Sequence, residues 1–326
     1  MASVAQWLAF YFYFLSYVNP LNKHSHYFCV KDKDMQRKEF LKKSLLGGAL
    51  LTSAAAIAHV IDNDIDELRP LDIVGHNHLP NTNDQVMNNS ILHRAESRGH
   101  ANHGWLDSHH TFSFANYYNP ERMNFGVLRV LNDDRVSEGM GFGTHPHDNM
   151  EIISIPLEGD LEHKDSMGNT ATIKHGDIQV MSAGTGITHS EYNPNKDRLV
   201  KFLQIWVFPN KRNVTPRYDQ ITLNPEDRHN TLQQILSPNS DDAGVWIHQD
   251  AWFHLGKFDQ DFEINYPVKK LSNGVYAFVL KGQFEINGQT LNDRDGLGIW
   301  EISNLTLKAL SADAEVLLME VPMLIG

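Results

Sequence analysis

Two alternating pairs of side chains limit the fold of this sequence more than any other feature. His145 and His147 flank a proline, and His189 and Glu191 flank a serine. In a β-strand, residues i and i+2 point to the same face, so each pair can face one interior from its own strand. Together they predict a site of three imidazole nitrogens and one carboxylate oxygen. Such a set suits a divalent first-row metal (Fe, Mn, Co, Ni or Cu) with positions open for water or substrate.

Glycines frame both pairs. They stand before the first pair, between the pairs and before the second: Gly139, Gly141, Gly143, Gly159, Gly176, Gly184 and Gly186. Glycine is needed where a chain turns sharply or approaches itself closely, as between the short strands of a small barrel. A lone His-x-His pair among 18 histidines would indicate a surface pair, whereas the glycine frame favours a metal site.

The spacing of these residues resembles the two cupin motifs. Gly139-x5-His145-x-His147-x3-Glu151, followed by a glycine, is similar to the first motif, and Gly186-x2-His189 is similar to the second. More narrowly, the stretches 98–118, 141–152, 157–169 and 181–194 resemble the pirin family, above all its bacterial quercetinase-like members. The resemblance runs from about Ile91 to Val321 and implies an all-β bicupin, which is two jelly-roll-like β-barrels in one chain.

The resemblance also implies a ligand set, because pirins hold their metal with three histidines and one glutamate. These match His145, His147, His189 and Glu191, whereas Glu151 takes the place where many other cupins keep their glutamate ligand and is left out. We therefore expect one divalent metal per chain, with Fe(II) ahead of Mn, Co, Ni and Cu. A carboxylate beside a bound enol can also accept its proton, so Glu191 is the candidate general base.

The activity implied by the resemblance is a quercetinase-like 2,3-dioxygenase reaction. It would open a small aromatic, flavonol-like substrate with O2. Two alternatives stay open. One is a non-enzymatic, iron-containing regulator that binds partner proteins, and the other is an enzyme for a different enol or phenol.

Residues 91–212 are predicted to form the metal-binding N-terminal barrel and residues 213–326 the C-terminal barrel. Short β-rich runs predict these strands: Phe125–Val130, Glu151–Leu157, Ile178–Met181, Leu199–Phe208, Val245–His248, Val275–Leu280, Phe284–Ile286, Gly298–Trp300, Leu305–Leu310 and Glu315–Val321. Asp165–Asn169 and Asn287-Gly288 are hairpin turns by composition, and Thr231–Leu236 is predicted as a brief helical patch.

An internal echo suggests that the second barrel copies the first. Leu157–Leu161 and Leu280–Phe284 share the pattern of an apolar residue, a charge, a glycine, a polar residue and an apolar residue. Counted back from the shared glycine, the His-x-His pair corresponds to Val268 and Lys270, and no histidine follows His254. The second barrel is therefore expected to bind no metal.

The other histidines and aromatic residues receive structural interpretations. His100, His103, His109 and His110 fit no closed metal site by spacing and are expected to make structural hydrogen bonds. Phe112, Phe114, Phe125 and Phe142 are expected to pack the barrel, with one or two facing the substrate. His163 and His175 are expected at exposed strand ends.

Composition bounds the partners. The net charge is −12 with no basic stripe, which argues against direct binding to nucleic acid. The one cysteine, Cys29, lies outside the resemblance, so redox chemistry would come from a bound metal or cofactor. The mature protein is expected to be monomeric and without a membrane anchor.

The first 90 residues are expected to lie outside the barrels. The apolar run Val4–Val18 is shorter than the roughly 20 residues that span a bilayer. Residues 35–58 have a basic start, an apolar stretch and Ala56-Ile57-Ala58, the form of a secretory signal, and Arg37-Lys38 resembles a twin-arginine motif with lysine in its second position. We expect export to the periplasm, Met35 as the true start and residues 59–90 as a linker; the alternative is a cytoplasmic protein with an amphipathic leader.

Overall fold

The computed structural model describes residues 89–324. The predicted leader, residues 1–58, and nearly all of the predicted linker lie outside the described residues. Within 89–324, no helix has the length and apolar character needed to cross a membrane. This part of the chain is almost entirely β-structure, with two short 3₁₀ helices, η1 (Ala95–Ser97) and η2 (Pro225–Arg228). The predicted all-β class is confirmed.

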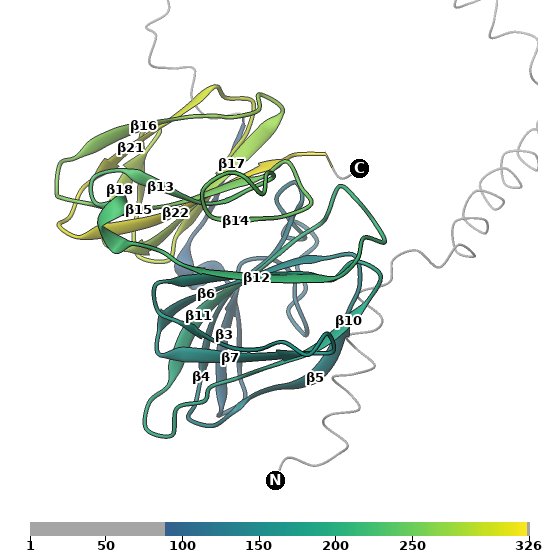
Figure 1. The fold of residues 1–326 in the computed structure, drawn as a ribbon. Coiled ribbons are helices and arrows are strands. Elements are labelled where there is room, and N and C mark those ends of the chain that lie inside the picture. Colours follow the sequence, from purple (N-terminus) through teal and green to yellow (C-terminus); the bar gives the residue numbers. More distant parts are fainter. Residues whose placement is uncertain (1–88, 325–326) are drawn as a thin grey trace, which may run out of the picture. The chain divides into compact units, whose positions relative to one another are not determined.

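A seven-stranded and a four-stranded sheet build the first barrel (Figure 1). In spatial order the large sheet contains β12 (Arg217–Thr222), β9 (Asp177–Ser182), β6 (Glu151–Glu158), β11 (Val200–Val207), β4 (Leu128–Val136), β3 (Leu106–His110) and β2 (Gly99–Asn102). The small sheet contains β5 (Gly141–His147), β10 (Ile187–Tyr192), β7 (Asp160–Asp165) and β8 (Thr170–Lys174). Leu106 and Phe202 of the large sheet pack with Leu161 and Ile173 of the small one, which closes this end of the barrel.

The second barrel repeats this plan. Its large sheet contains β1 (Ser90–His93), β20 (Gly296–Ile299), β17 (Asn273–Lys281), β22 (Ala314–Pro322), β15 (Trp252–Phe258), β13 (Leu232–Ser237) and β14 (Val245–Trp246). Its small sheet contains β16 (Glu263–Pro267), β21 (Asn304–Ala309), β18 (Phe284–Ile286) and β19 (Gln289–Leu291). Val275 and Leu318 from the large sheet pack against Phe284 and Leu305 from the small one. The predicted bicupin fold is confirmed.

The two large sheets share one hydrophobic core. It takes Ile153 and Ile205 from the first barrel and Phe253 and Leu317 from the second. Because side chains alternate along a strand, the residues between these positions on β6 and β11 face the interior of the first barrel. The shared core therefore fixes which residues of the large sheet can reach the predicted metal site.

The chain ends of each barrel contribute to the other barrel. β1 pairs with β20, so residues 90–93 lie in the large sheet of the second barrel. β12 pairs with β9, so residues 217–222 complete the large sheet of the first. Residues 90–93 and 217–222 thus each pair with strands from a distant part of the chain, because strand pairing is decided by long-range contacts.

Local turn chemistry was predicted well. The hairpin between β7 and β8 lies at Asp165–Asn169. Asn287 and Gly288 both have positive φ, 47° and 77°, as a tight hairpin between β18 and β19 requires. The predicted helical patch Thr231–Leu236 is wrong, since Leu232–Ser237 form β13, which pairs with β14 and β15. Six residues are too few to hold a helix alone, and strand pairing supplies their backbone partners.

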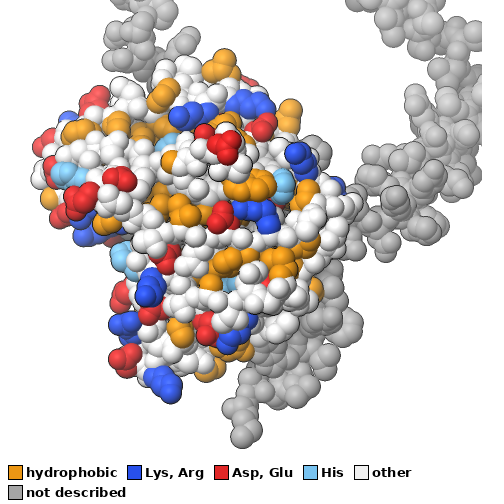
Figure 2. Space-filling view, in the orientation of Figure 1, with side chains coloured by type: hydrophobic (Ala, Val, Ile, Leu, Met, Phe, Trp, Pro, Cys, Tyr) orange, Lys and Arg blue, Asp and Glu red, His pale blue; other side chains and the backbone are white. Residues whose placement is uncertain are grey.

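The surface carries mixed charges. On the face shown in Figure 2, Lys and Arg lie interspersed with Asp and Glu rather than gathered in a stripe.

Candidate metal centre

Three imidazoles meet inside the first barrel. His145 and His147 come from β5 and His189 from the neighbouring strand β10, where His189 pairs directly with His145. One ring nitrogen from each lies within 4.8 Å of the others. The ring centroids are 4.9 Å apart for His145 and His147, 4.4 Å for His145 and His189, and 4.9 Å for His147 and His189. We call these three residues the histidine triad.

The close approach of β5 and β10 depends on Gly141. A Cβ at this position would lie 2.2 Å from the carbonyl oxygen of Glu191 and 2.5 Å from the Cα of Tyr192. No side chain fits there, so glycine lets the two strands come close enough for their histidines to meet. Gly141, one of the glycines that frame the two pairs, is thus required by the close approach of the strands.

The triad has the chemical state that a metal requires. Burial lowers the pKa of His145, and it lowers the pKa values of His147 and His189 well below the ordinary value. The rings are therefore neutral near pH 7, which is the form that binds metal. Nδ1 of His145 donates to the carbonyl of Gly143 at 2.7 Å, which leaves its Nε2 with a lone pair.

His189 adds a second sign of fit. Its side chain is buried, and its Nε2 has no hydrogen-bond partner in the described structure. A buried polar atom without a partner is costly, and a metal ion would satisfy it. The three donors therefore fit a divalent first-row metal.

Glu191 lies two residues after His189 on the same face of β10 and is buried. Its Oε1 accepts from the Ser154 hydroxyl at 3.1 Å, and its Oε2 accepts from Nε2 of Gln204 at 2.6 Å. It is not among the groups whose ligand atoms lie within 4.8 Å of one another. The structure thus brings three of the four predicted ligands together. Glu191 stands beside them on hydrogen bonds, and its role as a ligand stays a prediction.

Sequence reasoning missed Ser154 and Gln204. Both are buried and face the first barrel from β6 and β11. The sequence could have pointed to them, because each is a polar residue within a strongly apolar strand. Such a residue is buried and needs a hydrogen-bond partner. The register of β10 with β5 is irregular between His189 and Glu191, and we recognise no sequence signal for it.

His163 corrects a prediction. It was expected at an exposed strand end, but its side chain is fully buried and its ring lies 5.3 Å from that of His189. Its position on β7 puts it opposite Glu191, inside the barrel. The strand is covered by the large sheet there, which local composition could not reveal.

Aromatic rings wall the site on another side. Trp206 contacts His147 edge-on at a centroid distance of 4.9 Å, and Phe114 contacts Trp206 at 5.4 Å. Of the other predicted packing residues, Phe112 and Phe125 lie in the core shared by the barrels, and Phe142 packs at the closed end of the first barrel.

Glu151 lies away from the triad. It shares a strand face with Ile153, which belongs to the core between the barrels. Its Oε2 accepts from the hydroxyl of Ser182 at 2.6 Å, and burial raises its pKa to about 7. It therefore belongs to a separate buried hydrogen-bond pair.

The histidines near the start of the barrel form a different cluster. His100 contacts Asp107 through Nε2 at 2.7 Å and stacks on His109 at 4.4 Å. Ligand atoms of these three residues also lie within 4.8 Å of one another. The hydrogen bond and the stacking are what a structural role predicts. His110 is buried, with its ring 5.2 Å from that of Phe114.

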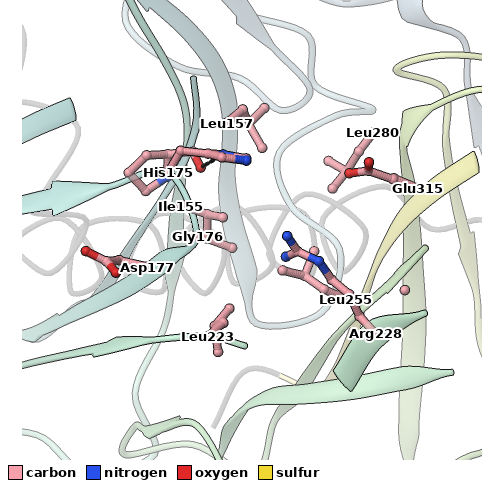
Figure 3. A pocket seen from close by; sticks show the side chains of 12 residues that line it. Ile155, Leu157, His175, Gly176, Asp177, Leu223, Arg228, Leu255, Leu280 and Glu315 are labelled. Atoms are coloured by element: carbon pink, nitrogen blue, oxygen red, sulfur yellow. Dashed lines mark hydrogen bonds between the residues drawn. The ribbon is translucent and has the colours of Figure 1, made fainter. Parts of the chain in front are cut away.

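A hollow of about 410 Å³, including its solvent-open part, lies where the two barrels meet. Figure 3 shows Arg228 and Glu315 reaching toward it from one side and His175 from the other. None of its lining residues belongs to the triad. It is a separate feature from the candidate metal centre.

The second barrel holds a carboxylate network in place of a histidine pair. Glu320 accepts from the backbone N–H groups of Lys269 and Lys270, both at 2.9 Å, in the segment that corresponds to the His-x-His pair. Tyr266 and Asn273 donate to the same carboxylate, at 2.7 and 3.0 Å. Hydrogen bonds thus hold the segment around Lys269 and Lys270. The corresponding segment of the first barrel carries two of the triad histidines, His145 and His147.

Metal analysis of the full-length protein should give a stoichiometry of at most one ion per chain. The reason is that the second barrel offers the Glu320 network and no histidine triad. Elemental analysis after removal of loosely bound metal is the measurement. A value near two would contradict the single-site interpretation.

Two family models match this chain, one for each barrel. The sequence model described as Pirin matches residues 92–207, and the model described as the quercetinase C-terminal cupin domain matches residues 234–321. A protein named quercetin 2,3-dioxygenase from Escherichia coli is 46% identical over 71% of this chain and 98% of its own length. A pirin-like protein from Caulobacter vibrioides is 40% identical over 68% of this chain and 95% of its own.

Among solved structures, the bacterial pirin YhhW from Escherichia coli in complex with nickel(II) is similar to the chain. The sequences are 45% identical, the TM-score is 0.68, and the match covers 72% of this chain and 99% of that one.

Proposed function

Because the chain belongs to the pirin family, we propose that it is a metal-dependent dioxygenase that opens the ring of a flavonol or a related enol with O2. The observation that carries the proposal is the buried, neutral histidine triad beside a hydrogen-bonded carboxylate. The relative named quercetin 2,3-dioxygenase supports the choice of substrate class.

The triad would hold the metal, with Glu191 as the proposed fourth ligand. We expect Fe(II), and the nickel complex of the related pirin supports a divalent first-row ion. When bound, such a metal supplies Lewis acidity and open coordination positions for an enolic oxygen and for O2.

The residues of the chain would carry the proton step. Glu191 accepts the proton of the substrate's enolic hydroxyl, since a carboxylate within reach of that oxygen acts as general base. Ser154 and Gln204 each donate to one oxygen of the carboxylate and hold it in place before substrate binds. Trp206 and Phe114 present apolar rings that keep water from the electron-rich enolate.

The test is elemental analysis of protein purified without added metal, followed by O2 uptake with quercetin. We expect one divalent metal and O2 consumption that disappears when a chelator removes the ion. Faster turnover of a different phenol would move the assignment to that substrate. Absence of O2 uptake with every phenol, together with partner capture that depends on the metal, would overturn the enzymatic proposal in favour of a regulator.

We also propose that the chain is exported. The signal-like residues 35–58 motivate this, and the mature protein from its native host should begin near His59. N-terminal sequencing of the periplasmic fraction is the measurement. Recovery of a protein that still carries residues 1–34 would contradict it.

A further inference from the structure

Behind His189, strand β7 places a second histidine and a carboxylate. In the register of β10 with β7, His189 lies opposite Asp165 and Glu191 lies opposite His163. The side chains of His163 and Asp165 are both fully buried. The ring of Tyr218 covers the ring of His163 at a centroid distance of 4.7 Å. His163 is therefore held between Tyr218 and His189 and cannot turn freely.

Two hydrogen bonds connect these groups in a line. Nδ1 of His189 lies 3.5 Å from Nδ1 of His163, and Nε2 of His163 lies 3.1 Å from Oδ2 of Asp165. A carboxylate only accepts, so the proton in the bond to Asp165 lies on Nε2 of His163, and Nδ1 of His163 faces His189 as the acceptor. Nδ1 of His189 must then be the donor. This leaves the lone pair of His189 on Nε2, the atom without a hydrogen-bond partner.

Asp165 is itself held in place by the hairpin that follows β7. Its Oδ1 accepts from the backbone N–H groups of Met167 and Asn169, at 2.9 and 3.1 Å. Its Oδ2 accepts from the side-chain amide of Asn169 at 2.8 Å. The hairpin thus fixes the carboxylate from which the line of hydrogen bonds begins.

We propose that Asp165 and His163 form a positioning relay that fixes the metal-binding tautomer of His189. The proposal rests on the metal centre of the proposed function. Groups that accept from a ligand histidine orient its ring and raise its basicity toward the metal. Here the acceptor is a second imidazole, and the carboxylate acts through it, so His163 and Asp165 are positioning residues that touch neither substrate nor metal.

The first test uses the metal-free wild-type protein. Nitrogen-15 NMR of ring-labelled histidine distinguishes the two tautomers, and a His189→Gln variant assigns the signals. We expect the proton of His189 on Nδ1. A proton on Nε2 in the wild-type protein would overturn the relay, and this result does not depend on any variant of His163.

The second test removes the relay. His163→Phe keeps a planar ring against Tyr218 and loses both hydrogen bonds. We expect the affinity for Ni(II), measured by competition with a chelator, to fall about 10- to 100-fold. We also expect the proton of His189 to distribute over both nitrogens in the metal-free variant. A folded variant with Ni(II) affinity within twofold of the wild type would contradict the proposal.

His175→Phe is the matched control. His175 is a histidine of the same barrel that hydrogen-bonds the carbonyl of Pro156 and lines the hollow between the barrels. Its replacement should leave Ni(II) affinity and the tautomer of His189 unchanged. Neither measurement requires turnover. A protein with an intact relay that does not react with flavonols would therefore contradict the proposed activity and leave the relay standing.

Discussion

Glu191→Gln should lose turnover by about 10²- to 10⁴-fold while metal binding weakens only moderately. Glutamine keeps the size of the side chain and an oxygen that can accept from Ser154. It removes the negative charge and the proposed base, and its amide group would face the side-chain amide of Gln204, which now donates to Oε2. Metal content and O2 uptake should be measured on the same preparations.

Two variants bracket this result. His147→Ala should lose metal and activity together, because it removes a triad ligand. Glu151→Gln changes another buried glutamate of the same barrel, on the face of β6 that meets the second barrel, and should leave turnover unchanged. Full activity and full metal in Glu191→Gln would show that the base lies elsewhere. Loss of turnover in Glu151→Gln alone would move the base to Glu151.

Glu320→Gln should destabilise the protein by about 1–3 kcal/mol, the range for leaving buried polar groups without partners. The carboxylate accepts from two backbone amides, the hydroxyl of Tyr266 and the amide of Asn273. A glutamine offers one acceptor oxygen and turns its own N–H groups toward some of these donors. The free energy of unfolding of metal-free protein, from urea titration, is the measurement.

The control for Glu320→Gln is Glu285→Gln, which makes the same chemical change at an exposed position of the second barrel. It should alter the free energy of unfolding by less than about 0.5 kcal/mol. Metal content should stay the same in both variants, because the triad lies in the other barrel. An unchanged stability for Glu320→Gln would mean that the carboxylate network does not hold the segment around Lys269 and Lys270.

The alternation of side chains along a strand is enough to place each predicted pair on one face. His145 lies on a face with His147, and His189 lies on a face with Glu191, because a strand repeats every two residues. The turn at Asn287 and Gly288 followed from local backbone preference in the same way. Such features depend on neighbours in sequence, so the sequence contains all that is needed to predict them.

Tertiary structure decided what surrounds the triad. His163 reaches the triad, and Ser154 and Gln204 reach Glu191, from strands whose order and register come from pairing between distant segments. The same kind of pairing makes Thr231–Leu236 a strand and exchanges β1 and β12 between the barrels. A residue's partners across a sheet depend on every strand between them, and no local pattern records that arrangement. The sequence thus determined which side chains share a strand face, and only the folded barrels determined the hydrogen bonds around them.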